Sequence, residues 1–269
     1  MKKKKTSIKG KPINPNIAIG RKYEAKLWKL IKRMTDETER ELRRLYKSDT
    51  GETFFAQDDS ISSQARIIMN KLMKKYEKLF ADHALNIAKQ FTTASHKEAD
   101  NATRRSLREL AEGFSIGRME VSKDMKEILK ATIAENVGLI KSIPQKYLHG
   151  IQGAVMRSIT TGNGLQDLNP YMMRHRAITH RRARMIALDQ TRKASVNISV
   201  QRMKDAGFTK FQWLHTGGGK TSRDLHKKLD GKVFEFAHPP LIQRNPTVYG
   251  LPGQLPNCRC RPRAILELS

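Results

Sequence analysis

The sequence has few of the residues that cross-link a small protein or fill its core. Its 269 residues include two cysteines, Cys258 and Cys260, and aromatic residues make up only 6% of the chain. Two cysteines one residue apart cannot form the disulfide framework of a small secreted protein, and a bridge between such close neighbours would be strained. We therefore expect reduced thiols, in a protein that stays in a reducing cytoplasm or in a particle assembled there.

Long apolar runs are also lacking. No stretch approaches the roughly 20 apolar residues that a membrane-spanning helix needs. The chain opens with MKKKK at residues 1–5, a charged start typical of signal peptides, but no apolar segment follows it. The sequence therefore predicts no membrane partner.

Acidic residues are scarce relative to basic ones. Lys and Arg total 52 against 26 Asp and Glu, which gives a formal net charge of +26 and an isoelectric point near 10.3. A surplus of this size attracts polyanions and exceeds what solubility requires. We expect nucleic acid to be the polyanion, with double-stranded DNA held through its phosphates. The alternatives are an anionic membrane surface and a basic surface that serves solubility alone.

Periodic apolar residues predict helices over most of the chain. Leu27, Ile31 and Met34 are spaced as one face of an amphipathic helix, and similar stripes recur as far as Ile198. Residues 1–20 are basic and contain Pro and Gly, which predicts a flexible arm. Residues 21–206 form the predicted helical region.

Two local signals predict where helices begin and end. Ser142, two residues before Pro144, is typical of a helix start. Gly207 is typical of the residue that follows a helix.

The pattern changes after residue 206. Phe211 and Trp213 alternate with polar residues as in a strand, residues 223–229 read as a short helix that Thr221 or Ser222 would cap, and residues 263–268 read as a closing strand. Residues 207–269 are therefore predicted to form a small module. The predicted fold class is α+β, with an extended, mainly helical N-terminal part and a small C-terminal α+β module.

One part of the helical region is strongly cationic. No Asp or Glu occurs between Asp167 and Asp189, and this interval contains the arginines predicted to bind DNA: Arg174, Arg176, Arg181, Arg182 and Arg184. Arginines in such density suit contacts with phosphates. The alternatives are a solvated face and the docking surface of an acidic protein.

The C-terminal module contains residue types that bind zinc. Cys258 and Cys260 supply two sulfur ligands close together, and His226 is the predicted third ligand. His215 and His238 are the two candidates for the fourth. A module of about 60 residues has little core and benefits from a staple of this kind. The alternative is a pair of reduced cysteines packed as small apolar groups, with the histidines at the surface.

A set of short motifs follows one order from residue 183 to residue 260. They are ARMIALDQT at 183–191, AGF at 206–208, Trp213, Arg223, His226, LDG at 229–231, PP at 239–240, PG at 252–253 and NCRC at 257–260. In this order they resemble the phage Mu F-like head-morphogenesis family of tailed phages. The resemblance runs from about Ile151 to the C-terminus.

The resemblance implies a minor capsid protein, located in the virion at the portal vertex. Its implied partners are the portal protein, the capsid shell and the packaged DNA, with residues 21–206 docking on the portal or shell and facing the DNA. It implies no enzymatic activity.

Two other classes of protein fit parts of the sequence. A metal-assisted nuclease is favoured by Asp224, His226 and Asp230 and by the cysteines beside a basic surface. A chromatin-like DNA-binding protein would explain the charge, but not the C-terminal motifs.

Overall fold

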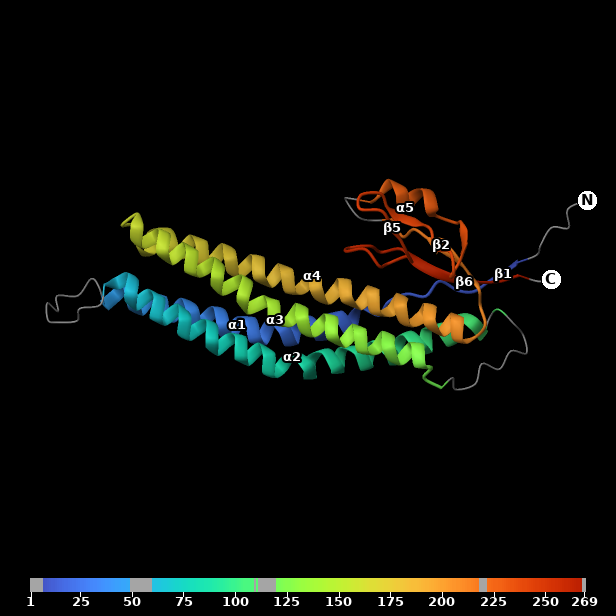
Figure 1. Cartoon of the computed structure of the whole chain (residues 1–269), viewed down its shortest axis with the longest axis horizontal. Coiled ribbons are helices and arrows are strands. Elements are labelled where there is room, and N and C mark those ends of the chain that lie inside the picture. The colour runs from blue at the N-terminus through green and yellow to red at the C-terminus, as the bar shows by residue number, and fades with distance from the viewer. Residues whose placement is uncertain (1–6, 49–59, 109, 111–119, 218–221, 268–269) are drawn as a thin grey trace, which may run out of the picture. The chain divides into compact units, whose positions relative to one another are not determined.

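The computed structural model describes residues 7–48, 60–108, 110, 120–217 and 222–267. Its helices are α1 (Ile17–Ser48), α2 (Ile61–Arg108), α3 (Lys123–Thr160), α4 (Leu165–Asp205) and the short α5 (Asp224–Leu229). Its strands are β1 (Ser7–Lys9), β2 (Lys210–Leu214), β3 (Val233–Glu235), β4 (Leu241–Gln243), β5 (Val248–Tyr249) and β6 (Arg261–Glu267) (Figure 1). The predicted α+β class is confirmed. The interruption predicted around Gly51 and the glycine turn at 217–221 fall largely outside the described residues.

Four strands form one antiparallel sheet in the order β1-β6-β2-β3, and β4 and β5 form a separate two-stranded sheet. In the larger sheet Phe211 pairs with Ala264 and with Phe234, so β2 has a partner on both sides. The first and last described strands of the chain, β1 and β6, lie side by side (Figure 1). The larger sheet therefore joins both ends of the sequence.

The chain divides into two compact units. Unit 1 consists of residues 1–20, 90–133 and 188–269, and unit 2 of residues 21–89 and 134–187. The boundaries fall inside α1, α2, α3 and α4, so each long helix contributes to both units. This division differs from the boundary expected at residues 206 and 207, because the sheet shares its core with parts of the helices.

The core of unit 1 shows this sharing directly. Phe211 and Trp213 of β2 are fully buried in one cluster with Val196, Val200 and Met203 of α4. Phe211 also stacks on Phe236 at a centroid distance of 5.1 Å. Residues 207–269 therefore do not close a core of their own.

The N-terminal arm needs a correction over its described part. Ser7–Lys9 is not a flexible segment but strand β1, and Gly10 N–H donates to Ala264 O over 3.1 Å. Ser106 donates to Lys11 O over 2.6 Å, and Ile13 is buried in the core of unit 1. The basic composition gave no sign of this strand, because its pairing partner β6 lies 256–260 residues away in the sequence.

In its described residues, unit 2 consists of helices and the turn between α3 and α4. Leu27, Ile31 and Met34 of α1 are fully buried, as the spacing predicted, and Tyr76 and Phe80 of α2 are buried as well. The Tyr76 hydroxyl donates to Glu37 Oε2 over 2.6 Å. No described helix is long and apolar enough to cross a membrane.

The helix start predicted at Ser142 is wrong, whereas the helix end predicted at Gly207 is confirmed. Pro144 lies inside α3. Ser142 donates to Leu139 O over 2.7 Å instead of capping a first turn. Gly207 has φ +83° and donates to Lys204 O, while Phe208 N–H donates to Met203 O. This pair of bonds is the Schellman arrangement, which satisfies the last carbonyls of a helix.

Candidate functional site

Three chemistry-bearing side chains meet inside unit 1. His226 comes from α5, and Cys258 and Cys260 come from the turn before β6. His226 Nδ1 lies 3.4 Å from Cys258 Sγ and 3.7 Å from Cys260 Sγ. Their ligand atoms all lie within 4.8 Å of one another, and the three residues are 2%, 3% and 4% exposed. The structure thus brings together the three residues that were singled out as metal ligands.

The local backbone explains how the two cysteines point the same way. Cys258 and Cys260 are buried while Arg259 between them is exposed, which is the alternation of an extended segment. Asn257 precedes them with φ +60°, a conformation that asparagine tolerates better than most residues. Asn257 N–H donates to Asp189 Oδ1 of α4 over 2.7 Å, which fixes the turn before Cys258.

A hydrogen bond fixes the orientation of the His226 ring. Its Nε2 lies 3.0 Å from the backbone oxygen of Ile242. A carbonyl only accepts, so Nε2 carries the proton and Nδ1 presents a lone pair to the sulfurs. The Trp213 indole packs edge-on against the ring at 5.3 Å. This is the tautomer that a metal-binding histidine requires.

The two remaining candidate histidines differ sharply. His215 Nδ1 lies 3.4 Å from Cys260 Sγ, and its Nε2 lies 2.8 Å from Ser222 Oγ. His238 is exposed and lies beside Glu235.

The cap predicted at Ser222 is wrong. The Ser222 hydroxyl lies against His215, and the N-cap position of α5 is Arg223, which makes no side-chain cap.

The two thiols titrate as a pair. The pKa of Cys258 is lowered, because its thiolate accepts a hydrogen bond from Cys260. The pKa of Cys260 is raised by the same hydrogen bond, by burial and by the charge of Cys258. Ionisation of one of these two thiols therefore opposes ionisation of the other.

The predicted DNA-binding arginines separate into two groups. Arg176 Nη1 lies 2.8 Å from Asp36 Oδ1, and Arg182 Nη2 donates to Ser142 Oγ over 3.1 Å, so these two serve the packing of unit 2. Arg174, Arg181 and Arg184 are exposed and, within the described part of the chain, make no hydrogen bond or ion pair. Their spacing of seven and three residues places them on one side of α4. We call these three residues the α4 arginine face.

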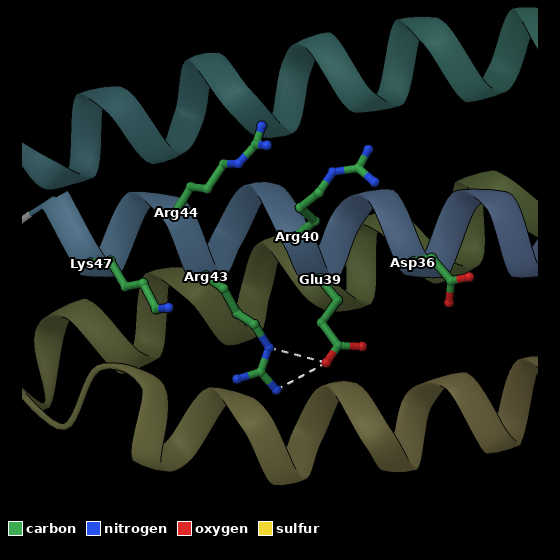
Figure 2. Close-up of a pocket in the computed structure, with 6 residues that line it drawn as sticks. All are labelled: Asp36, Glu39, Arg40, Arg43, Arg44 and Lys47. Carbon is green, nitrogen blue, oxygen red and sulfur yellow. Dashed lines mark hydrogen bonds and ion pairs between the residues drawn. The ribbon is translucent and has the colours of Figure 1, made fainter.

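A second basic surface lies on α1. A shallow pocket of about 360 Å³ is lined by Arg40, Arg43, Arg44, Lys47, Asp36 and Glu39 (Figure 2). Arg43 is bonded to Glu39, and Arg44 lies 3.2 Å from Glu41. Carboxylates balance much of the positive charge, so this pocket is a weaker phosphate site than the α4 arginine face.

The carboxylates that favoured a nuclease do not converge on the cluster. Asp224 is exposed and lies 2.9 Å from Lys227 Nζ. Asp230 accepts from the backbone N–H of His215 over 2.8 Å. Among the described residues, the group of three potential ligands that the structure assembles is the His226, Cys258 and Cys260 cluster.

A buried charged group in unit 1 was not anticipated. Arg202 is 2% exposed, with its Nε 2.6 Å from Asp100 Oδ1 and its Nη1 donating to Glu120 O over 2.8 Å. Its Nη2 lies 3.3 Å from His96 Nε2, and burial together with this guanidinium lowers the pKa of His96. The available signal was positional, because Arg202 continues the buried stripe of Ala194 and Ile198.

Comparison with known proteins identifies part of the chain. Residues 149–263 match the family model described as Phage Mu protein F like protein, so this part of the chain is similar to that family and the resemblance is confirmed there. The family is one of phage head-morphogenesis proteins. The matched residues include the predicted metal ligands and the α4 arginine face.

One curated relative extends the similarity toward the N-terminus. The chain is 29% identical over 250 residues to an uncharacterized protein of Haemophilus influenzae (strain ATCC 51907 / DSM 11121 / KW20 / Rd). The match covers 91% of this chain and 53% of that protein, so the chain spans about half the length of the relative. No solved structure matches the chain.

Proposed function

We propose that this protein is a structural component of a tailed-phage head, present at the portal vertex and in contact with packaged DNA. The observation that carries the proposal is the match of residues 149–263 to the phage Mu F-like family. The net charge of +26 supports it, because a protein facing densely packed DNA gains from phosphate contacts.

A structural role, without catalysis, agrees with the character of the cluster in unit 1. His226, Cys258 and Cys260 are buried, and the acids of the nuclease alternative lie elsewhere or are engaged. A hydrolytic metal centre keeps a position open to water and substrate. We therefore assign this cluster to folding of the module.

The α4 arginine face is the proposed contact with DNA. Arg174, Arg181 and Arg184 point outward without intramolecular partners among the described residues. Ile178 and Met185 are exposed beside them, 47% and 45% accessible, and phosphates do not cover such side chains. A protein of the portal or shell could also cover this mixture of cationic and apolar side chains on α4. The test therefore needs two readouts.

The first readout is particle composition. Heads purified from the phage that encodes this chain should contain it in few copies, and immunogold labelling should place it at the portal vertex. Its absence from purified heads, or labelling spread evenly over the shell, would contradict the proposal.

The second readout is DNA affinity as a function of salt. Replacing Arg174, Arg181 and Arg184 with Gln should reduce the salt slope of binding by about 3, since each phosphate contact contributes about 0.9. The matched control changes Lys71, Lys74 and Lys78 of α2, which are also exposed. Equal losses in both variants would mean diffuse basic binding, and a variant that binds DNA normally but is missing from heads would assign the face to a protein partner.

A further inference from the structure

We propose that Cys258, Cys260, His226 and His215 together bind one zinc ion, in a closed tetrahedral site that staples unit 1. The inference is independent of the role in the phage head, since it rests on the geometry of four side chains. His215 is the residue that completes the site, and it decides whether the site is closed or open.

The spacing of the ligand atoms matches a zinc tetrahedron. Bonds of about 2.3 Å to sulfur and about 2.0–2.1 Å to nitrogen place sulfur and nitrogen roughly 3.6 Å apart across a tetrahedral angle. The three sulfur–nitrogen distances in the cluster are 3.4, 3.7 and 3.4 Å, two involving His226 and one involving His215. These distances place His226 against both sulfurs and His215 against the sulfur of Cys260, at the separations that ligands of one zinc ion have.

The two imidazole rings are oriented alike. Each presents Nδ1 to sulfur, and each holds Nε2 against an oxygen, Ile242 O in one case and Ser222 Oγ in the other. Metal-binding histidines are held by such outer hydrogen bonds, which fix the tautomer and aim the lone pair. Packing alone does not require two histidines to turn Nδ1 toward the same sulfur, that of Cys260.

The donor set selects the kind of metal. Two thiolates and two imidazoles are soft and borderline ligands, which favour zinc over the oxygen-seeking Mg²⁺ and Ca²⁺. The ion would neutralise two buried thiolates.

The fourth ligand separates a structural site from a catalytic one. Three protein ligands and one open position are typical of a catalytic zinc, whereas four protein ligands are typical of a structural zinc. His215 lies beyond the 4.8 Å group that the other three form, although its Nδ1 is 3.4 Å from Cys260 Sγ. Binding of one ion by all four residues therefore requires the His215 ring to move closer to the other ligands, whereas His238 is exposed and lies beside Glu235.

The decisive experiment uses the unmodified full chain. Protein purified without chelator should contain one zinc per chain. X-ray absorption at the zinc edge should show two sulfurs near 2.3 Å, two nitrogens near 2.0–2.1 Å and the scattering of two imidazoles. Zinc-free protein, or a zinc centre with one imidazole, would overturn the proposal.

Variants then identify the histidine. His215→Ala should weaken zinc binding by more than the roughly 10–100-fold expected when an outer partner is removed, and Ser222→Ala should fall within that range. The matched control, His238→Ala, should bind zinc as the unmodified chain does. Unchanged affinity in His215→Ala, or a loss in His238→Ala equal to it, would reject His215 as the ligand.

Discussion

Units 1 and 2 differ in where they place their ionisable groups. Unit 1 buries them: Arg202 is enclosed with Asp100, and His226 lies against two buried cysteines. Unit 2 buries an apolar stripe and keeps its ion pairs near the surface, as with Lys75 and Glu37. A unit held by a few buried polar groups loses much when one is removed, whereas a unit held by many apolar contacts loses stability in small steps.

Removal of metal should have the largest effect and should separate the two units. Structural zinc supplies roughly 10–16 kcal/mol of apparent binding energy in small zinc-finger peptides. A strong chelator at neutral pH should therefore expose residues 222–260 to hydrogen exchange while residues 61–89 stay protected. Equal loss of protection in both units, or none in unit 1, would contradict this difference.

Breaking the buried ion pair should have the next largest effect. Arg202→Met leaves Asp100 buried without its main partner, which typically costs about 3–5 kcal/mol. Asp100 also lies 2.9 Å from Arg104, so part of its charge stays compensated. Urea unfolding of Arg202→Met should show this loss, and the double variant that also carries Asp100→Asn should recover part of it. A change below about 1 kcal/mol would mean that Arg202 is dispensable.

Truncating the central aromatic of unit 1 should cost a similar amount. Trp213 is fully buried among the core residues of α4 and β6 and packs against His226. Trp213→Ala should destabilise unit 1 by about 3–5 kcal/mol, and Trp213→Phe should cost less because it keeps most of the apolar volume. Limited proteolysis checks this, with unchanged resistance in Trp213→Ala as the contrary result.

The same contrast explains what the sequence predicted. Unit 2 follows from periodicity, because Leu27, Ile31 and Met34 lie on one helical face whatever the partner helix is. The strands of residues 207–269 were also recognisable, since Phe211 and Trp213 alternate with polar neighbours. These signals are local, and each can be read within about ten residues.

What could not be predicted depends on contacts between distant parts of the chain. Strand β1 has no apolar alternation, and it is a strand because Ser7–Lys9 pairs with β6. Pro144 stays inside α3 because the surrounding helix packing outweighs one lost hydrogen bond. For the candidate site, residue types pointed to His226 and the cysteines, but only the fold distinguishes His215 from His238.

Acid should reveal a smaller, graded effect in unit 2. Burial opposes ionisation of Glu37, but hydrogen bonds from Lys75 and Tyr76 outweigh it and lower its pKa from 4.5. A lowered pKa in the folded state adds stability above about pH 4.5, and this contribution is lost as the pH falls further. Glu37→Gln should therefore reduce stability at pH 7 and flatten its fall between pH 5 and pH 3. An unchanged acid profile in thermal melts followed by circular dichroism would refute the role of Glu37.

The smallest effect on stability should come from the α4 arginine face, and it tests the division between internal and external arginines. Arg174, Arg181 and Arg184 are exposed and make no hydrogen bond or ion pair within the described chain, so replacing all three with Gln should change the free energy of unfolding by no more than about 0.5 kcal/mol per site. Replacing Arg176 and Arg182 should cost more in total, because Asp36 and Ser142 each lose one of their partners. DNA affinity should fall more in the triple variant than in the double variant, since phosphates meet the exposed side chains and not those bonded within the protein. Urea unfolding and salt-dependent DNA binding, measured on the same two variants, check both comparisons. A double variant that stays stable but binds DNA more weakly would show that the interface uses Arg176 and Arg182 instead.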